Sequence, residues 1–237
     1  MKSRLLGAAC ACILSLTATS ACAALIDNLN GTVTQTRTDG SRLMWSQDAN
    51  HAGNNLTDAR VAEIISAVGS IDGHTLTVSD FETDTFGYTG RMNWWAAMAW
   101  VDQLVLAETD DWRLPSMDVN GDTTIVICDG TNGSVCLDNE YGYLYWESGI
   151  NTHNQTPFNS VQPRPTWSST PWAPDTTAAW NFDFGDGSRS SWTKEAYEYA
   201  WAVRELAPIP IPPALYLFGS GLIALVGMAR TRAAKNE

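Results

Sequence analysis

The sequence predicts an α+β domain at residues 24–207, between an N-terminal signal peptide and a C-terminal membrane-tail helix. Three observations lead to this prediction. Two segments carry apolar residues at helical spacing, and several short segments alternate apolar with polar residues as half-buried strands do. Both ends of the 237-residue chain are apolar runs beside basic residues. We therefore expect one exported domain with two helices and a mostly antiparallel sheet.

Residues 1–23 have the three parts of a signal peptide. Lys2 and Arg4 are followed by the apolar run Leu5–Leu16, and Ala21–Ala23 supplies the small residues expected at a cleavage site. Lipid attachment at Cys22 is an alternative, although the Leu that usually begins such a motif is missing. Removal of this segment would leave a chain that starts near residue 24.

Residues 208–237 combine a Pro-rich linker, an apolar span and a basic end. The span covers Pro213–Ala229 and reaches roughly 25 Å as a helix, slightly less than the ~30 Å hydrocarbon core of a bilayer. Arg230, Arg232 and Lys235 then favour a cytoplasmic end. The predicted topology is an external domain with a membrane tail.

The acidic charge of the chain argues against nucleic-acid binding. The whole chain has 14 basic and 26 acidic residues, a net charge of −12. Five of the basic residues and one acidic residue lie in the two end segments, so the central domain has a net charge of −16. A domain this acidic is not expected to bind phosphate backbones through a basic surface. All eleven Trp residues belong to the central domain.

The first part of the domain is predicted to hold two strands and a helix. The strands are Thr32–Thr36 and Arg42–Trp45, joined through a turn at Asp39-Gly40. Thr57 is the predicted N-cap of the helix and Gly69 its end, and apolar residues recur between them at Val61, Ile64, Ile65 and Val68. Residues 70–90 are polar and rich in turn formers, which predicts a loop or a small hairpin.

A second helix and a long loop follow. Asn93 is the predicted N-cap, and one apolar face is formed by Trp94, Ala97, Met98, Val101, Leu104 and Val105. We expect this helix to end at Asp110–Pro115. The loop Ser116–Glu140 is rich in Asp, Asn and Gly, and a loop of this length is usually functional, metal-bound or cross-linked.

The last third of the domain is predicted to be β. Trp180, Phe182 and Phe184 alternate with polar residues, and Asp186-Gly187 forms a turn. A closing strand carries its apolar residues at Tyr199, Trp201 and Val203.

Five sequence blocks occur in order along the domain. They are Tyr88–Trp100, Asp111–Pro115, Trp167–Thr170, Ala179–Gly187 and Tyr199–Arg204. Together they resemble the Lcl C-terminal domain family, named for the last domain of a bacterial collagen-like adhesin, over roughly residues 30–205. The resemblance implies a C-type-lectin-like α+β fold and an extracellular binding or adhesion role, without assigned catalytic residues.

The C-terminal segment resembles a PEP-CTERM sorting signal, which implies processing by an exosortase in a bacterium that makes exopolysaccharide. Ile211 stands where the motif carries Glu, which leaves the cleavage point undefined. The residues that carry the resemblance are a Pro pair, two Gly in the span and the basic stop: Pro210, Pro212, Gly219, Gly221, Arg230 and Arg232.

The segment 118–129 has the spacing of an EF-hand-type or dockerin-type calcium loop. Oxygen ligands fall at positions 1, 3, 5, 7 and 12 of such a loop, which are Asp118, Asn120, Asp122, Thr124 and Asp129. Thr123 replaces the usual Gly at position 6, and Asp129 is shorter than the usual Glu. Calcium is therefore the candidate cofactor, and the alternative is an acidic turn in a solvated loop.

Cys128 and Cys136 are the two cysteines outside the signal peptide, and both lie in the long loop. In an exported protein an isolated pair is most simply a disulfide. The alternative is a metal-binding or catalytic thiol pair, since formylglycine-generating enzymes have a related fold and use cysteines. No His lies near the pair in the sequence to act as a base or a ligand.

Aromatic residues supply the remaining candidates for a binding surface. Trp180 and Trp201 are expected in the core because they lie on predicted strands. Trp146, Trp172 and Trp192 lie in turn-rich segments, where they either pack within loops or form exposed platforms for sugar rings.

Other residues that could carry chemistry give weaker patterns. His51, His74 and His153 have no metal-ligand spacing. Ser168 and Ser169 lack a nucleophile elbow, so their hydroxyls are expected to bond local backbone. Paired carboxylates for glycoside hydrolysis remain open, because their separation in space is not visible in the sequence.

We therefore expect an exported, non-enzymatic binding or adhesion protein of the cell surface or the exopolysaccharide matrix. Its expected partners are an exosortase-type enzyme, an extracellular polysaccharide and, through the tail, the membrane. One alternative is a secreted enzyme on the same scaffold, sugar-active or similar to formylglycine-generating enzymes. The other is a structural matrix protein without a discrete ligand.

Overall fold

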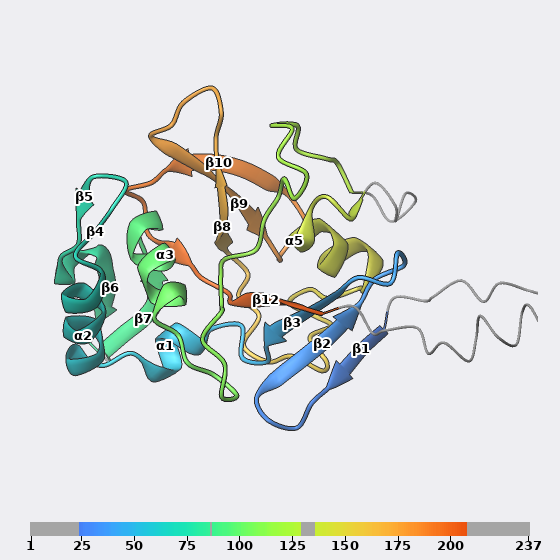
Figure 1. Ribbon diagram of the computed structural model, residues 1–237, viewed down its shortest axis with the longest axis horizontal. Helices are drawn as coiled ribbons and strands as arrows, with labels where there is room; N and C mark the ends of the chain where they lie inside the picture. Colours follow the sequence, from blue (N-terminus) through green and yellow to red (C-terminus); the bar gives the residue numbers. More distant parts are fainter. Residues whose placement is uncertain (1–23, 86, 129–135, 208–237) are drawn as a thin grey trace, which may run out of the picture.

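Two sheets of different size, mostly antiparallel, form the framework of the chain in a computed structural model, which describes residues 24–85, 87–128 and 136–207. A short two-stranded ribbon, β4-β5, is added to them. The predicted α+β class is confirmed (Figure 1). The strands are β1 (Ala24–Asp27), β2 (Thr32–Thr36), β3 (Arg42–Ser46), β4 (Ser70–Ile71), β5 (His74–Thr75), β6 (Phe81–Asp84), β7 (Gly87–Met92), β8 (Pro165–Pro171), β9 (Ala178–Asp183), β10 (Arg189–Thr193), β11 (Glu198–Tyr199) and β12 (Val203–Leu206).

The smaller sheet has the strand order β1-β2-β3-β12 and is antiparallel throughout. The predicted strands at Thr32–Thr36 and Arg42–Trp45 are its two central members. Its register aligns Ala24 with Thr36, Thr36 with Arg42, and Arg42 with Leu206. Both ends of the described chain therefore leave from the same end of this sheet (Figure 1).

The larger sheet has the order β10-β9-β8-β11-β7-β6, with one parallel pairing between β8 and β11. Its edge strand β10 forms a hairpin with β9, in which Trp192 pairs with Ala179 and Ser191 with Trp180. In Figure 1 this hairpin lies on the opposite side of the molecule from β1 and β2.

The helices are short, and the two longest begin where the sequence predicts. They are α1 (His51–Asn55), α2 (Asp58–Val68), α3 (Trp94–Asp102), α5 (Glu140–Gly142), the 3-10 turn η1 (Val78–Asp80) and the π-type turn η2 (Tyr143–Glu147). The Thr57 side chain accepts a hydrogen bond from the Arg60 amide, and Asn93 accepts one from Ala96. Gly69 ends α2 with a positive φ of 72°.

The structure corrects three of the predicted boundaries. The second helix ends at Asp102 rather than at Asp110–Pro115, and Val105 is 68% exposed. Residues 70–90 hold two pairs of strands and one 3-10 turn, more than a loop or a small hairpin. The closing strand around Tyr199 is two strands, because the chain leaves the larger sheet after β11 and enters the smaller one as β12.

Aromatic side chains dominate two buried clusters. One surrounds α3, which is buried on most sides instead of along a single face, because helix α2 and the strands β4 and β8 contact it. The other contains Trp45, Tyr141 and Trp201 together with Phe182 and Phe184. Several buried indole N–H groups donate to protein oxygens, as when Trp45 donates to Gln35.

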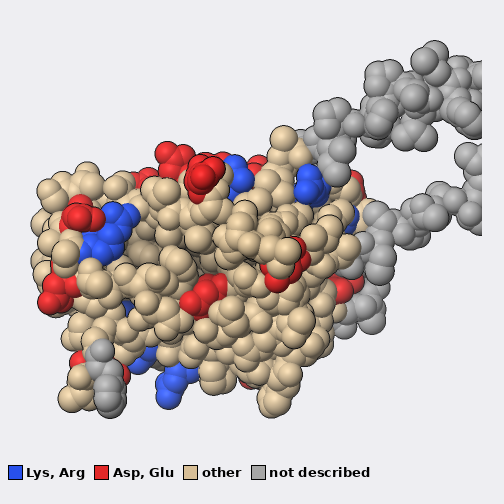
Figure 2. All heavy atoms as spheres, turned by 90° about the horizontal axis from the view of Figure 1, so that it is seen from below, with Lys and Arg blue, Asp and Glu red and all other residues tan. Residues whose placement is uncertain are grey.

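Several predictions concern segments outside the described residues, namely the signal peptide at 1–23 and the whole tail at 208–237. Within the described part of the chain, no helix is long and apolar enough to span a membrane. On the face drawn in Figure 2, the Lys and Arg side chains are interspersed with Asp and Glu side chains and with wide uncharged areas.

Candidate functional site

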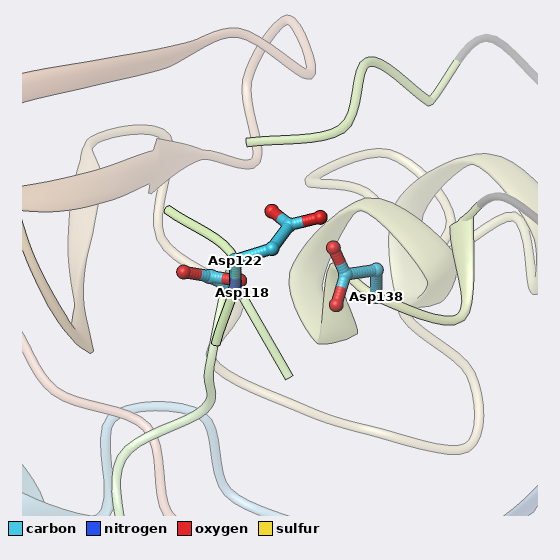
Figure 3. A group of neighbouring side chains, drawn as sticks. All are labelled: Asp118, Asp122 and Asp138. Atoms are coloured by element: carbon cyan, nitrogen blue, oxygen red, sulfur yellow. The ribbon is translucent and has the colours of Figure 1, made fainter. Parts of the chain in front are cut away.

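Three carboxylates from two separate segments meet in the long loop. Each of Asp118, Asp122 and Asp138 places a carboxylate oxygen within 4.8 Å of the other two (Figure 3). Asp118 and Asp122 lie in the loop that leaves Pro115, and Asp138 lies just before α5. Among the described residues, this is the one group of three or more His, Cys, Asp and Glu side chains close enough to share a metal ion.

Backbone amides shape this part of the loop. The two carboxylate oxygens of Asp118 accept hydrogen bonds from the amides of Asp122 (3.1 Å) and Thr123 (2.9 Å). Asp122 accepts one from Thr124 at 2.7 Å. Thr123 has a φ of +67°, so it adopts the left-handed conformation for which calcium loops usually employ Gly.

The structure keeps part of the predicted ligand set and changes the rest. Asn120 lies beside the cluster, and its side chain donates to Asp122 at 3.3 Å. Asp129 is outside the described residues, and Thr124 is exposed. Asp138 was not predicted, because it lies beyond the twelve-residue spacing on which the motif rests.

Asp138 also supplies an independent sign that this group of side chains suits a cation. Its Oδ1 accepts from the Asn120 amide at 2.7 Å, but its Oδ2 is buried without a hydrogen-bond partner in the described part of the chain. A buried carboxylate oxygen without a donor is costly unless a cation or water satisfies it. Three carboxylates and nearby amide oxygens are the donors that calcium prefers.

Cys128 and Cys136 form the predicted disulfide, with their Cα atoms 5.3 Å apart. Both side chains are buried and pack with Tyr143. The covalent link ties one end of the acidic loop to the segment that carries Asp138.

The three Trp residues predicted as sugar platforms occupy different places. Trp172 and Trp192 line one hollow of about 330 Å³ beside β10. Trp192 is 58% exposed. Trp146 is 40% exposed but packs edge-on against Tyr145 and lines none of the hollows described here.

A larger hollow of about 470 Å³ brings together residues that the sequence placed in separate categories. Trp172 and Trp180 line it, with Asp118 and Arg189 also on its walls. The prediction that Trp180 lies in the core is therefore wrong in part, because its side chain is only half-buried, whereas Trp201 is buried as predicted. Trp180 lies on β9, one strand from the edge of the larger sheet, and its side chain borders this hollow.

The sequence blocks from Tyr88 to Arg204 hold the fold together. Trp94 donates its indole N–H to the Ser168 carbonyl, and Trp167 donates to the Met92 carbonyl, both at 2.9 Å. Arg113 pairs with the buried Glu140, while Asp111 pairs with Arg204. The polar groups of these blocks therefore make hydrogen bonds and ion pairs within the domain.

The remaining candidates for chemistry have structural partners as well. The Ser168 hydroxyl donates to the Trp180 carbonyl and the Ser169 hydroxyl to the Pro115 carbonyl, so both bond the backbone of distant segments and not the local backbone that the sequence predicts. His74 stacks on Trp95 and contacts Asp80. Burial lowers the pKa of His51, against the attraction of Asp48, which raises it.

Calcium is expected to stabilise the domain. Millimolar calcium would neutralise the repulsion among Asp118, Asp122 and Asp138, and extracellular sites of this kind have a Kd of roughly 10⁻⁴–10⁻³ M. At about 10 mM calcium the gain is then roughly 1.4–2.7 kcal/mol, seen as a rise in Tm over the same protein in EDTA.

The double variant Asp118→Ala, Asp122→Ala should lose this rise. A matched double variant at two exposed carboxylates elsewhere, Asp102→Ala and Asp110→Ala, should keep it. Magnesium should stabilise less, because it requires a tighter octahedral shell. Identical melting curves in calcium and EDTA would show that the segment is only an acidic turn.

The comparison with known protein families matches the chain over residues 31–204 to the Lcl C-terminal domain. No curated protein matches the chain significantly. The family match covers most of the described residues and includes all five sequence blocks. The chain therefore belongs to the Lcl C-terminal domain family.

Proposed function

We propose that this protein is a non-enzymatic binding protein of the cell surface or the exopolysaccharide matrix, and that its ligand is a polysaccharide. The observation that carries the proposal is the hollow lined by Trp172 and Trp180 with Asp118 and Arg189. Indole faces pack against the C–H faces of sugar rings, while a carboxylate and a guanidinium hydrogen-bond to hydroxyl groups. This is the combination of groups that a sugar site needs.

The acidic cluster supports the same function, because Asp118 belongs to both places. Its carboxylate is one of the three in the cluster, and its side chain lines the hollow. A cation held by Asp118, Asp122 and Asp138 would therefore be bound at the rim of the sugar site. A cation site next to a sugar site agrees with the C-type-lectin-like fold that the resemblance of the sequence blocks implies. We include this fold relationship in the proposal.

Export and sorting complete the proposal. The segment at 1–23 is proposed as a signal peptide and the segment at 208–237 as a PEP-CTERM-type signal, processed by an exosortase. Both segments join the domain at the same end of the smaller sheet, opposite the β9-β10 hairpin (Figure 1). The test is an intact-mass measurement on protein isolated from the cell envelope. A mass showing that Arg230 is still present would contradict the processing step.

The thiol-dependent enzyme alternative has less support in the structure. A redox or formylglycine-generating role needs free thiols, whereas Cys128 and Cys136 are joined and buried. The structural alternative, a matrix protein without a ligand, does not explain why two half-buried Trp side chains line an open hollow.

The test is the mobility of the full chain in native gels that contain a dissolved polysaccharide. Trp172→Ala is expected to weaken the affinity for the polysaccharide, measured from the retardation, about tenfold, because the loss of one stacking surface costs roughly 1.5 kcal/mol. Trp146→Ala is the matched control, since Trp146 is partly exposed but does not line the hollow. Equal retardation of both variants would contradict the proposed site.

A further inference from the structure

We propose that three adjacent hollows along the edge of the larger sheet form one groove for an extended, uncharged polysaccharide chain, in which several sugar units bind at once. The inference rests on the proposed function and specifies its ligand. The first hollow is the one that contains Trp180, and the second is the one between Trp172 and Trp192. The third, of about 470 Å³, lies between Trp95 and Lys194.

The hollows follow one another because neighbours share lining residues. Trp172 lines both the first and the second. Thr177 and Thr193 line both the second and the third. Strand β10 runs beside all three, from Arg189 in the first to Thr193 in the third, and the following residue is Lys194. At about 3.3 Å per residue this stretch covers roughly 16 Å, which is longer than a single sugar ring.

Trp95, which lines the third hollow, carries an unpaired hydrogen-bond donor. The indole Nε1 of Trp95 is buried and has no partner among the residues that the structure describes. The ring itself is held in place, because it stacks on His74 with the ring centroids 4.1 Å apart. A buried donor beside an open hollow suits a ligand oxygen, such as a sugar hydroxyl.

The walls of the groove are ordered before any ligand binds. The Asp175 carboxylate accepts hydrogen bonds from both the amide and the hydroxyl of Thr177, and the Lys194 amide donates to the Thr177 carbonyl. The Lys194 ammonium lies 4.0 Å from the centre of the Trp94 ring and 3.7 Å from the Asp72 carboxylate. Prior order of this kind reduces the entropy lost on binding.

Charge selects among polysaccharides. Four carboxylates lie along the groove, at Asp72, Asp118, Asp175 and Glu195, against the two cations Arg189 and Lys194. Lys194 is already paired and only 5% exposed. The rest of the central domain adds to the negative field, with a net charge of −16. An anionic polymer would be repelled, which favours an uncharged occupant over an anionic one.

The test compares chain lengths and charges with the full chain in mild detergent. Native gels containing dextran, laminarin, glucomannan or alginate show which polymers retard it, and calorimetry then measures fragments of a retarding polymer from disaccharide to hexasaccharide. We expect retardation by at least one neutral polymer, none by alginate, and at least tenfold tighter binding of hexasaccharide than of disaccharide.

Two variants test whether the tighter binding of the hexasaccharide comes from the second and third hollows. Thr193→Arg, at an exposed position between the second and third hollows, should reduce hexasaccharide affinity to the disaccharide level and leave disaccharide affinity unchanged. Trp95→Phe, which keeps the ring and removes the N–H, should weaken only the longer fragments. Trp146→Phe is the control and should change neither.

The possible failures are distinct. Equal affinity for disaccharide and hexasaccharide would overturn the groove and leave the single sugar site. Retardation by alginate as strong as by a neutral polymer would overturn the selection by charge. An absence of retardation by every polymer would overturn the proposed function and the groove together.

Discussion

Glu140→Ala is expected to destabilise the domain by roughly 3–5 kcal/mol, because it removes the buried carboxylate that pairs with the buried Arg37 and the partly buried Arg113. The Glu140 side chain is 1% exposed. Its two oxygens accept from Nη1 and Nη2 of Arg113, each at 2.7 Å, and one also accepts from the Ser116 amide. Arg37, 6% exposed, lies 3.7 Å away. Burial alone would lower the pKa of Arg113, but its hydrogen bond and attraction to Glu140 raise that pKa above the ordinary value.

Urea unfolding followed by circular dichroism measures this loss. The matched control is Glu205→Ala, because Glu205 also contacts Arg113, at 3.3 Å, but is 76% exposed. An exposed pair of this kind contributes no more than about 1 kcal/mol. If both substitutions cost the same, the buried network does not hold the loop to the sheet as the structure indicates.

Local features of the fold were predictable because their causes lie close in the sequence. Thr57 and Asn93 each cap a helix by accepting a hydrogen bond from an amide three residues later. The strands on either side of Asp39-Gly40 are predicted by that turn and by the alternation of apolar and polar residues. The division of the last strand was not predictable in this way. The residues around Trp201 alternate evenly, and only the tertiary arrangement shows that the chain changes sheets there.

The candidate site shows the same division between local and long-range information. The spacing of Asp118, Asn120 and Asp122 marked the acidic loop, and two cysteines in one exported loop predicted the disulfide. Asp138 joins the carboxylates only through the fold of the loop. Trp180 looked like a core residue because alternation does not distinguish a covered strand face from one that borders an open hollow.

Glu198→Gln is expected to stabilise the domain by up to about 3 kcal/mol at pH 8 and to change little near pH 4.5. Glu198 is 8% exposed; its Oε1 accepts from Asn181 at 2.9 Å, while its Oε2 has no partner among the described residues. Burial, the largest cause, raises its pKa from 4.5 to about 7, helped by Asp183 and opposed by Asn181 and Arg91.

The sign of the pH dependence follows from this raised pKa. Between about pH 4.5 and 7 the folded state binds a proton that the unfolded state has released, so the free energy of unfolding falls as pH rises through this window. Above about pH 7 the buried carboxylate is ionised, and the loss is complete. Gln has no such titration and keeps an oxygen that can accept from Asn181, so the variant should unfold with a weaker pH dependence over the same window.

Thermal unfolding at pH 4.5 and pH 8 separates the two proteins. At pH 8 the expected rise in Tm is roughly 6–12 °C for a domain of this size, since 1 kcal/mol corresponds to about 2–4 °C. Glu195→Gln, at an exposed carboxylate three residues earlier, is the control and should change the free energy of unfolding by less than about 0.5 kcal/mol at either pH. A Glu198→Gln effect of the same size at both pH values would contradict the raised pKa, because a carboxyl whose pKa is the same in the folded and unfolded states adds no pH dependence to the free energy of unfolding.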